Sequence, residues 1–131
     1  MALHIENLEV EDIKEKLDEI NQEFEGKSPQ EILKWVFNTF GEKVVLASSL
    51  GLEDQVLTHM SIKTFLKLHV FFLDTGRLNQ ETYDVLAESI EKYKIKYDIY
   101  FPRAEEVERF QGDFGPNAFY QSLELRHRCC Q

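Results

Sequence analysis

Two thiols side by side are the most distinctive reactive groups in this sequence. Cys129 and Cys130 are its only cysteines, and they follow a basic run in the segment "RHRCCQ". Soft thiolates are the ligands that iron–sulfur clusters and zinc prefer, but both kinds of site normally use four ligands. Adjacent cysteines also exclude a framework of loop-closing disulfides. The pair therefore indicates either half of a metal site or two thiols without a chemical role.

The segment "ASSLGLEDQV", residues 47–56, has the composition of an oxyanion-binding loop. An apolar run leads into Ser48, Ser49 and Gly51, and a helical pattern then opens on two acidic residues. Small residues let backbone N–H groups approach a ligand closely, and a helix N-terminus attracts anions. The segment lacks the glycines of the dinucleotide fingerprint and the Gly-Lys-Ser/Thr of a P-loop. It predicts contacts with a phosphate or sulfate, or else a polar turn in which Ser49 or Asp54 only caps a helix.

The segment "LDTGRLNQETY", residues 73–83, follows a second apolar run. Asp74 and Thr75 stand at the predicted end of a strand, with Gly76 behind them. Such a position presents backbone and side-chain groups to a base or ribose, and Arg77 is placed to meet an anion. The alternative is a capped turn in which Asp74 accepts hydrogen bonds from neighbouring N–H groups.

Alternating strand and helix patterns predict how these segments are held. The predicted strands and helices alternate at 43–48, 53–66, 67–74, 80–94 and 96–101. Near-continuous apolar strands separated by helices predict an α/β fold, a three-layer arrangement in which helices cover both faces of a parallel sheet. We expect Val56 and Ile90 among the buried positions of the two helices. Ligands of open α/β sheets bind beyond the carboxyl ends of the strands, where both loop segments lie.

Helical patterns also precede and follow the predicted sheet. An amphipathic helix is predicted over residues 5–24, and a second helix starts at Ser28 as N-cap, with Glu31 closing a capping box. Further helices are predicted at 104–110 and 118–130. Only three strands are predicted, fewer than sheets usually have, so we expect the sheet to be incomplete at its C-terminal end.

Composition narrows the classes of function. The 131 residues carry a net charge of −9, which lacks the basic surplus of a nucleic-acid-binding protein. No apolar run is long enough to span a bilayer, and the first residues do not form a secretory signal. We therefore expect a cytoplasmic protein with no nucleic-acid or membrane partner.

Taken together and in this order, the three segments resemble those of the assimilatory adenylyl-sulfate and phosphoadenylyl-sulfate reductases. That family's modified pyrophosphate loop is similar to "SSLGLEDQV", its Leu-Asp-Thr-Gly segment to "LDTGRLNQETY", and its first pair of cluster cysteines to the adjacent cysteines here. The family shares its fold with ATP pyrophosphatases. The resemblance implies an adenine-nucleotide alpha-hydrolase-like, nucleotide-binding α/β domain at 28–131, preceded by an N-terminal helical segment at 1–27.

The resemblance also implies an activity and its residues. Family members reduce adenylyl sulfate or phosphoadenylyl sulfate to sulfite and AMP or adenosine 3′,5′-bisphosphate, in sulfate assimilation. A cysteine attacks the sulfur of the substrate, and thioredoxin or glutaredoxin then releases sulfite. The first loop would contact the anionic part of the substrate and the second would hold the adenosine. The residues implied to bind substrate are Ser48, Ser49, Gly51, Leu73, Asp74, Thr75 and Gly76.

Cys129 and Cys130 would supply half the ligands of a 4Fe–4S cluster, which favours adenylyl sulfate because family members with the cluster mostly use that substrate. The sequence contains no second cysteine pair and no further cysteine to act as nucleophile. We therefore expect the N-terminal portion of a reductase that is inactive alone, with a cluster shared across a homo-oligomer as one possibility.

Two other functions remain open at this point. One is an ATP pyrophosphatase-type enzyme that adenylates its substrate, although Ser49 and Leu50 stand where those enzymes carry two glycines. The other is a non-catalytic nucleotide-binding fragment, whose exposed sheet edges would favour oligomers.

Overall fold

The computed structural model describes residues 14–130, which form two compact units. The first unit comprises residues 14–73 and 79–99, and the second comprises residues 74–78 and 100–130. In chain order the elements are α2 (Leu17–Phe24), α3 (Pro29–Phe40), η1 (Gly41–Lys43), β1 (Val45–Ser48), α4 (Leu52–Thr64), β2 (His69–Leu73), α5 (Gln80–Tyr93), β3 (Tyr97–Tyr100), α6 (Ala104–Phe114), η2 (Ala118–Tyr120) and α7 (Leu123–Cys130). Of the helix predicted over 5–24, the part before residue 14 lies outside the described residues.

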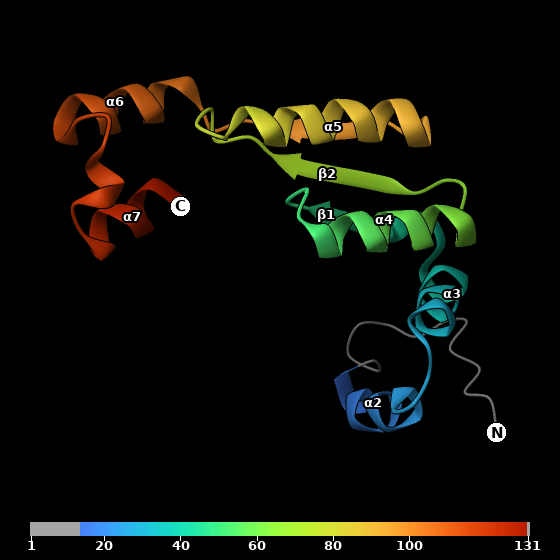
Figure 1. Ribbon diagram of the computed structural model, residues 1–131. Helices are drawn as coiled ribbons and strands as arrows, with labels where there is room; N and C mark the ends of the chain where they lie inside the picture. Colours follow the sequence, from blue (N-terminus) through green and yellow to red (C-terminus); the bar gives the residue numbers. More distant parts are fainter. Residues whose placement is uncertain (1–13, 131) are drawn as a thin grey trace. The chain divides into compact units, whose positions relative to one another are not determined.

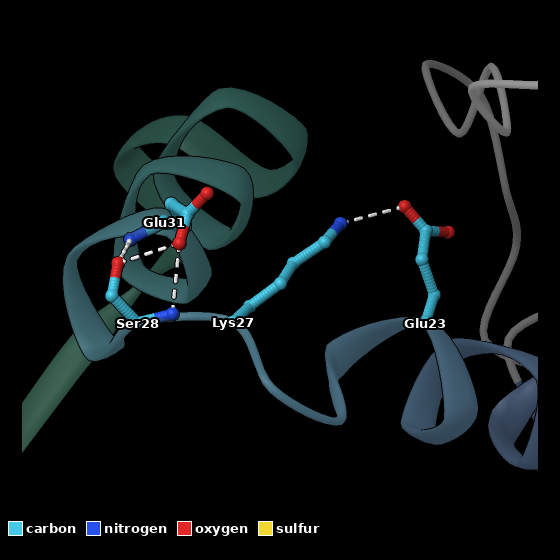
Figure 2. A network of polar contacts seen from close by, with 4 residues as sticks. All are labelled: Glu23, Lys27, Ser28 and Glu31. Atoms are coloured by element: carbon cyan, nitrogen blue, oxygen red, sulfur yellow. Dashed lines mark hydrogen bonds and ion pairs between the residues drawn. The ribbon is translucent and has the colours of Figure 1, made fainter.

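The turn between α2 and α3 is fixed by the predicted capping box (Figure 2). The Ser28 hydroxyl accepts a hydrogen bond from the Glu31 N–H at 3.3 Å, and the Glu31 carboxylate accepts the Ser28 N–H at 2.8 Å. Lys27 and Glu23 form an ion pair at 2.8 Å across the end of α2. The local sequence thus determines where α3 starts, and the prediction is confirmed.

The three strands form a parallel sheet in the order β1-β2-β3. Figure 1 labels β1 and β2 of this sheet. Val45 pairs with His69 and Ser48 pairs with Phe72, so β1 and β2 start level and β2 extends one residue further. Helix α4 packs against both β1 and α3. The predicted α/β class, a parallel sheet with flanking helices, is confirmed.

The two faces of the sheet differ in burial. Val70 and Phe72 are 0% and 2% exposed, whereas Val45 and Leu73 are 51% and 61% exposed. Since successive residues of a strand point to opposite faces, one face is buried and the other is open among the described residues. The expectation of strands buried on both faces is therefore wrong for this part of the chain. Apolar composition marked the strands correctly but did not indicate which face is covered.

The buried positions of α4 are Thr58 and Ser61, and those of α5 are Leu86 and Ser89. Thr58, Ser61 and Ser89 are almost completely buried, while Val56 and Ile90 are 56% and 39% exposed. The predicted inward positions of Val56 and Ile90 are therefore wrong. Short side chains such as Thr58, Ser61 and Ser89 allow a helix to lie close to its neighbours in a densely packed interior.

Candidate functional site

The turn after β1 has an unusual backbone. Ser48 ends the strand and is 6% exposed, and its hydroxyl accepts a hydrogen bond from the Leu50 N–H at 3.1 Å. Leu50 is buried and adopts a left-handed conformation with φ of +65°, which costs roughly 1–2 kcal/mol for a residue other than glycine. Burial of its side chain offsets this cost and keeps the turn in shape. Sequence reasoning missed Leu50 as a structural feature, because leucine gives no signal for a positive φ.

Ser49 directs both of its donors at one carboxylate. Its N–H donates to Asp54 Oδ2 at 2.6 Å, and its hydroxyl donates to the same oxygen at 2.7 Å. The hydrogen bond from the Ser49 hydroxyl is the main reason that the pKa of Asp54 is lowered, against the opposing effect of burial. This contact ties the loop to the first turn of α4, but neither Ser49 nor Asp54 caps the helix, whose N-cap residue is Gly51. The same contact shows that Ser49 presents two donors suited to an oxyanion.

An open hollow of about 330 Å³ lies at the carboxyl ends of β1 and β2, within the first unit. Its wall is formed by Ala47, Ser48, Ser49, Glu53, Asp54, Phe71 and Leu73. Three of the predicted substrate-binding residues, Ser48, Ser49 and Leu73, therefore line one hollow. The lining contains two carboxylates and no lysine or arginine, so any anion here depends on hydroxyl and N–H donors.

Gly51 is the N-cap residue of α4 and lies beside the hollow's acidic wall. A Cβ atom at this position would lie 3.1 Å from Glu53 Oε2, which is tighter than an ordinary contact. No side chain caps the first turn of α4. The N–H groups there have no partners within the helix and carry partial positive charge.

The predicted adenosine segment forms a tight turn in the second unit. Asp74 is 6% exposed, its N–H donates to the Tyr100 carbonyl at 2.8 Å, and its Oδ1 accepts the Gly76 N–H at 2.7 Å. Gly76 has φ of +77°, a conformation that favours glycine. These bonds are those of the capped turn that was the alternative, in which Asp74 accepts a hydrogen bond from a neighbouring N–H group. Thr75 is exposed in this turn.

Arg77 contacts the protein itself, through a segment that sequence reasoning did not connect with it. Its Nη1 donates to the Pro116 carbonyl, and its Nη2 donates to Asn117 Oδ1 at 3.1 Å. The guanidinium also lies 5.0 Å from the centre of the Phe119 ring. The partners follow 39 residues or more along the chain, so no local pattern signals the contact.

The cysteine pair lies at the end of α7, where Cys129 is exposed. Among the side chains that the structure describes, which do not include that of Cys130, no three histidine, cysteine or acidic groups gather into a metal-binding group. The last predicted helical stretch is divided between η2 and α7, so it is not continuous. A four-thiolate cluster does not fit the two thiols alone.

Comparison with known proteins identifies the family of this chain. Residues 43–131 match the family model described as the phosphoadenosine phosphosulfate reductase domain. The chain belongs to this family. The matched range includes the sheet, both loop segments and the cysteine pair, and the suspected resemblance is confirmed. The family has the adenine-nucleotide alpha-hydrolase-like fold, so the predicted fold class is confirmed as well.

Related proteins agree with the family match. The adenosine 5′-phosphosulfate reductase of Burkholderia cepacia is 39% identical over 89 residues, which cover 68% of this chain and 36% of that protein. The 5′-adenylylsulfate reductase 3, chloroplastic, of Arabidopsis thaliana is 36% identical over 127 residues, which cover 96% of this chain and 27% of that protein. The chain spans about a third of the length of the curated relatives it matches. No helix in the described range is long and apolar enough to cross a membrane.

Proposed function

We propose that this chain supplies the nucleotide-binding part of an adenylyl-sulfate reductase. The observation that carries the proposal is the hollow at the ends of β1 and β2, with Ser48, Ser49 and Leu73 on its wall. It lies where open α/β sheets bind ligands, and within the range that matches the family. The similar proteins of Burkholderia cepacia and Arabidopsis thaliana are named for reduction of adenylyl sulfate.

The anionic part of the substrate is assigned to Ser48, Ser49 and Gly51. Ser49 already holds a carboxylate oxygen with two short hydrogen bonds, and a phosphate or sulfate oxygen has the same needs. A bound oxyanion takes the place of the Asp54 carboxylate, whose side chain then turns away. The first N–H groups of α4 add partial positive charge, which supports binding in a hollow without basic side chains.

The adenosine part is assigned to Leu73 and to the turn of Asp74, Thr75 and Gly76. This assignment rests on their match with the family's Leu-Asp-Thr-Gly segment. Leu73 offers an exposed apolar side chain, which suits the face of a base. The exposed peptide groups at Thr75 and Gly76 suit the polar edge of a base or the ribose.

The proposed reaction is a two-electron reduction. A cysteine thiolate attacks the sulfur of adenylyl sulfate, the bond from sulfur to the phosphate oxygen breaks, and AMP leaves. The resulting S-sulfonate is cleaved by a dithiol of thioredoxin or glutaredoxin, which is oxidised to a disulfide as sulfite departs. Cys129 and Cys130 match the cluster ligands of the family, so neither is assigned as the nucleophile. We therefore expect no sulfite release from this polypeptide alone.

The cysteine pair is proposed to supply half the ligand set of a 4Fe–4S cluster, with the other thiolates coming from another polypeptide segment. A homo-oligomer that shares the cluster is one arrangement of this kind. The cytoplasm remains the proposed compartment. The Arabidopsis relative is named chloroplastic, which is a property of that protein.

Calorimetric titration of the 131-residue chain with AMP tests the binding proposal. Ser49→Ala removes one hydroxyl donor and is expected to weaken AMP binding about tenfold, since a hydrogen bond to a charged group contributes roughly 1.5–3 kcal/mol. Ser28→Ala is the matched control, because it removes a serine near another helix start, outside the hollow. Equal affinity of the two variants would contradict the assignment.

Parallel titrations distinguish the substrates and the rival function. Tighter binding of adenosine 3′,5′-bisphosphate than of AMP would favour the 3′-phosphorylated substrate. ATP-dependent pyrophosphate release would favour an adenylating enzyme. The side chains of Ser49 and Leu50 argue against that second function, because they stand where such enzymes carry two glycines.

A further inference from the structure

We propose that Arg77 is a positioning residue, which holds the turn of Asp74–Gly76 in shape by tying it to residues 116–119 instead of contacting the anion of the substrate. The inference rests on the proposed function, in which this turn contacts adenosine. It concerns contacts within the second unit only. It also changes the role that the sequence suggested, in which Arg77 meets an anion.

Arg77 is held by three contacts. Nη1 donates to the Pro116 carbonyl, Nη2 donates to Asn117 Oδ1 at 3.1 Å, and the guanidinium lies 5.0 Å from the centre of the Phe119 ring. A planar guanidinium can donate from its edge and stack on an aromatic ring together, which a lysine ammonium cannot do. The geometry therefore depends on arginine itself and not only on positive charge.

The segment that receives Arg77 is well anchored. Ala118 is 0% exposed, and its N–H donates to the Gly115 carbonyl at 3.3 Å. The Tyr120 N–H donates to the Asn117 carbonyl at 3.0 Å, and η2 packs against α7. Arg77 therefore contacts a segment that has its own hydrogen bonds and a buried residue at its centre.

The turn itself is fixed at its start by two backbone N–H groups. The Asp74 N–H donates to the Tyr100 carbonyl at 2.8 Å, and Gly76 donates back to Asp74 at 2.7 Å. Arg77 comes next in the chain and supplies the tie on the other side. Without the Arg77 contacts, Thr75 and Gly76 are expected to adopt a wider range of conformations. A ligand that binds only one of these conformations would then bind more weakly.

Comparison of AMP with adenosine separates positioning from direct contact. Adenosine lacks the phosphate, so an arginine that contacts the anion affects AMP binding alone. An arginine that shapes the turn affects both ligands by the same factor. Arg77→Lys keeps the positive charge but loses the planar guanidinium with its two donor nitrogens. Asn117→Ala removes one hydrogen-bond acceptor of Arg77 and leaves Arg77 itself unchanged.

We expect Arg77→Lys to weaken binding of AMP and of adenosine equally, by about fivefold to tenfold. Asn117→Ala is expected to weaken both by about fivefold, the effect of one ordinary hydrogen bond. Arg103→Lys is the control, since Arg103 lies in the same unit, is highly exposed and has only a distant carboxylate at 3.9 Å. A loss confined to AMP, or unchanged affinity for both ligands in both variants, would overturn the proposal.

Hydrogen exchange of residues 74–78 keeps this test separate from the proposed function. If the unaltered chain binds neither ligand, the proposed function fails while the exchange measurement still reports on the turn. Faster exchange of the Gly76 amide in Arg77→Lys and Asn117→Ala than in Arg103→Lys supports the tie. Equal exchange in all three variants overturns it.

Discussion

Replacement of Asp54 by alanine is expected to destabilise the fold and to strengthen anion binding. The Asp54 carboxylate accepts the Ser49 N–H at 2.6 Å and the Ser49 hydroxyl at 2.7 Å. Hydrogen bonds to a charged group contribute roughly 1.5–3 kcal/mol, and a carboxylate in the first turn of a helix adds roughly 0.3–1 kcal/mol. Ser49 is exposed, so water replaces part of what is lost. We therefore expect a loss of about 2 kcal/mol in the free energy of unfolding.

The same substitution frees the two donors of Ser49 and removes one negative charge from the hollow. AMP no longer competes with Asp54 for those donors, so its affinity is expected to rise about tenfold, which corresponds to about 1.4 kcal/mol. Denaturant unfolding followed by circular dichroism measures the first effect, and calorimetric titration with AMP measures the second. Asp54 would then stabilise the fold and compete with the ligand, which is a known compromise between stability and activity at binding sites.

Glu53→Ala is the matched control for Asp54→Ala. Glu53 also lines the hollow from the first turn of α4, but both Ser49 donors are directed at Asp54. We expect Glu53→Ala to change the free energy of unfolding by less than about 0.5 kcal/mol, as is usual at exposed positions. The reasoning is refuted if Asp54→Ala is as stable as Glu53→Ala, or if its affinity for AMP does not exceed that of the unaltered chain.

Three further results are expected. The Ser28 hydroxyl and N–H lower the pKa of Glu31 below its usual 4.5. The stabilisation by Glu31 is therefore present above pH 4.5 and is lost as the pH falls through the folded-state pKa. Denaturation at several pH values should show that the difference in free energy of unfolding between the unaltered chain and Glu31→Gln disappears in acid. Burial raises the pKa of Tyr97 against the opposing effect of the nearby Ser89 and Thr58 hydroxyls, and the Tyr97 hydroxyl makes no hydrogen bond of normal geometry within the described residues. Tyr97→Phe should therefore be at least as stable as the unaltered chain, and should lack its loss of stability as pH rises above about 10; a loss above 1 kcal/mol at neutral pH would show a hidden partner. Turnover with adenylyl sulfate and thioredoxin should release no sulfite from the 131-residue chain; sustained sulfite release would contradict this expectation.

Local features of the fold were predictable from the sequence. The capping box at Ser28 depends on residues three positions apart, and the strands were recognisable as short apolar runs between helices. Burial was less predictable, because Val56 and Ile90 are exposed while Thr58 is fully buried. Helical periodicity identifies a helix, but which of its faces turns inward depends on the size of neighbouring side chains.

The candidate site was predictable to a similar degree. Ser48, Ser49 and Leu73 line one hollow, as expected for residues at the carboxyl ends of adjacent parallel strands. The partners of their polar groups were not predictable. The left-handed conformation of Leu50 has no signal in a leucine, and Arg77 reaches a carbonyl 39 residues away. Contacts of this kind depend on tertiary packing, which local spacing does not encode.

Titration of the 131-residue chain with AMP, in the presence and absence of the Ser49→Ala substitution, tests the central claim most directly. The account predicts one AMP per chain, with about tenfold weaker binding for Ser49→Ala and unchanged binding for Ser28→Ala. Absence of AMP binding by a chain whose circular dichroism shows it to be folded would contradict the claim that the hollow beside β1 and β2 is a nucleotide site.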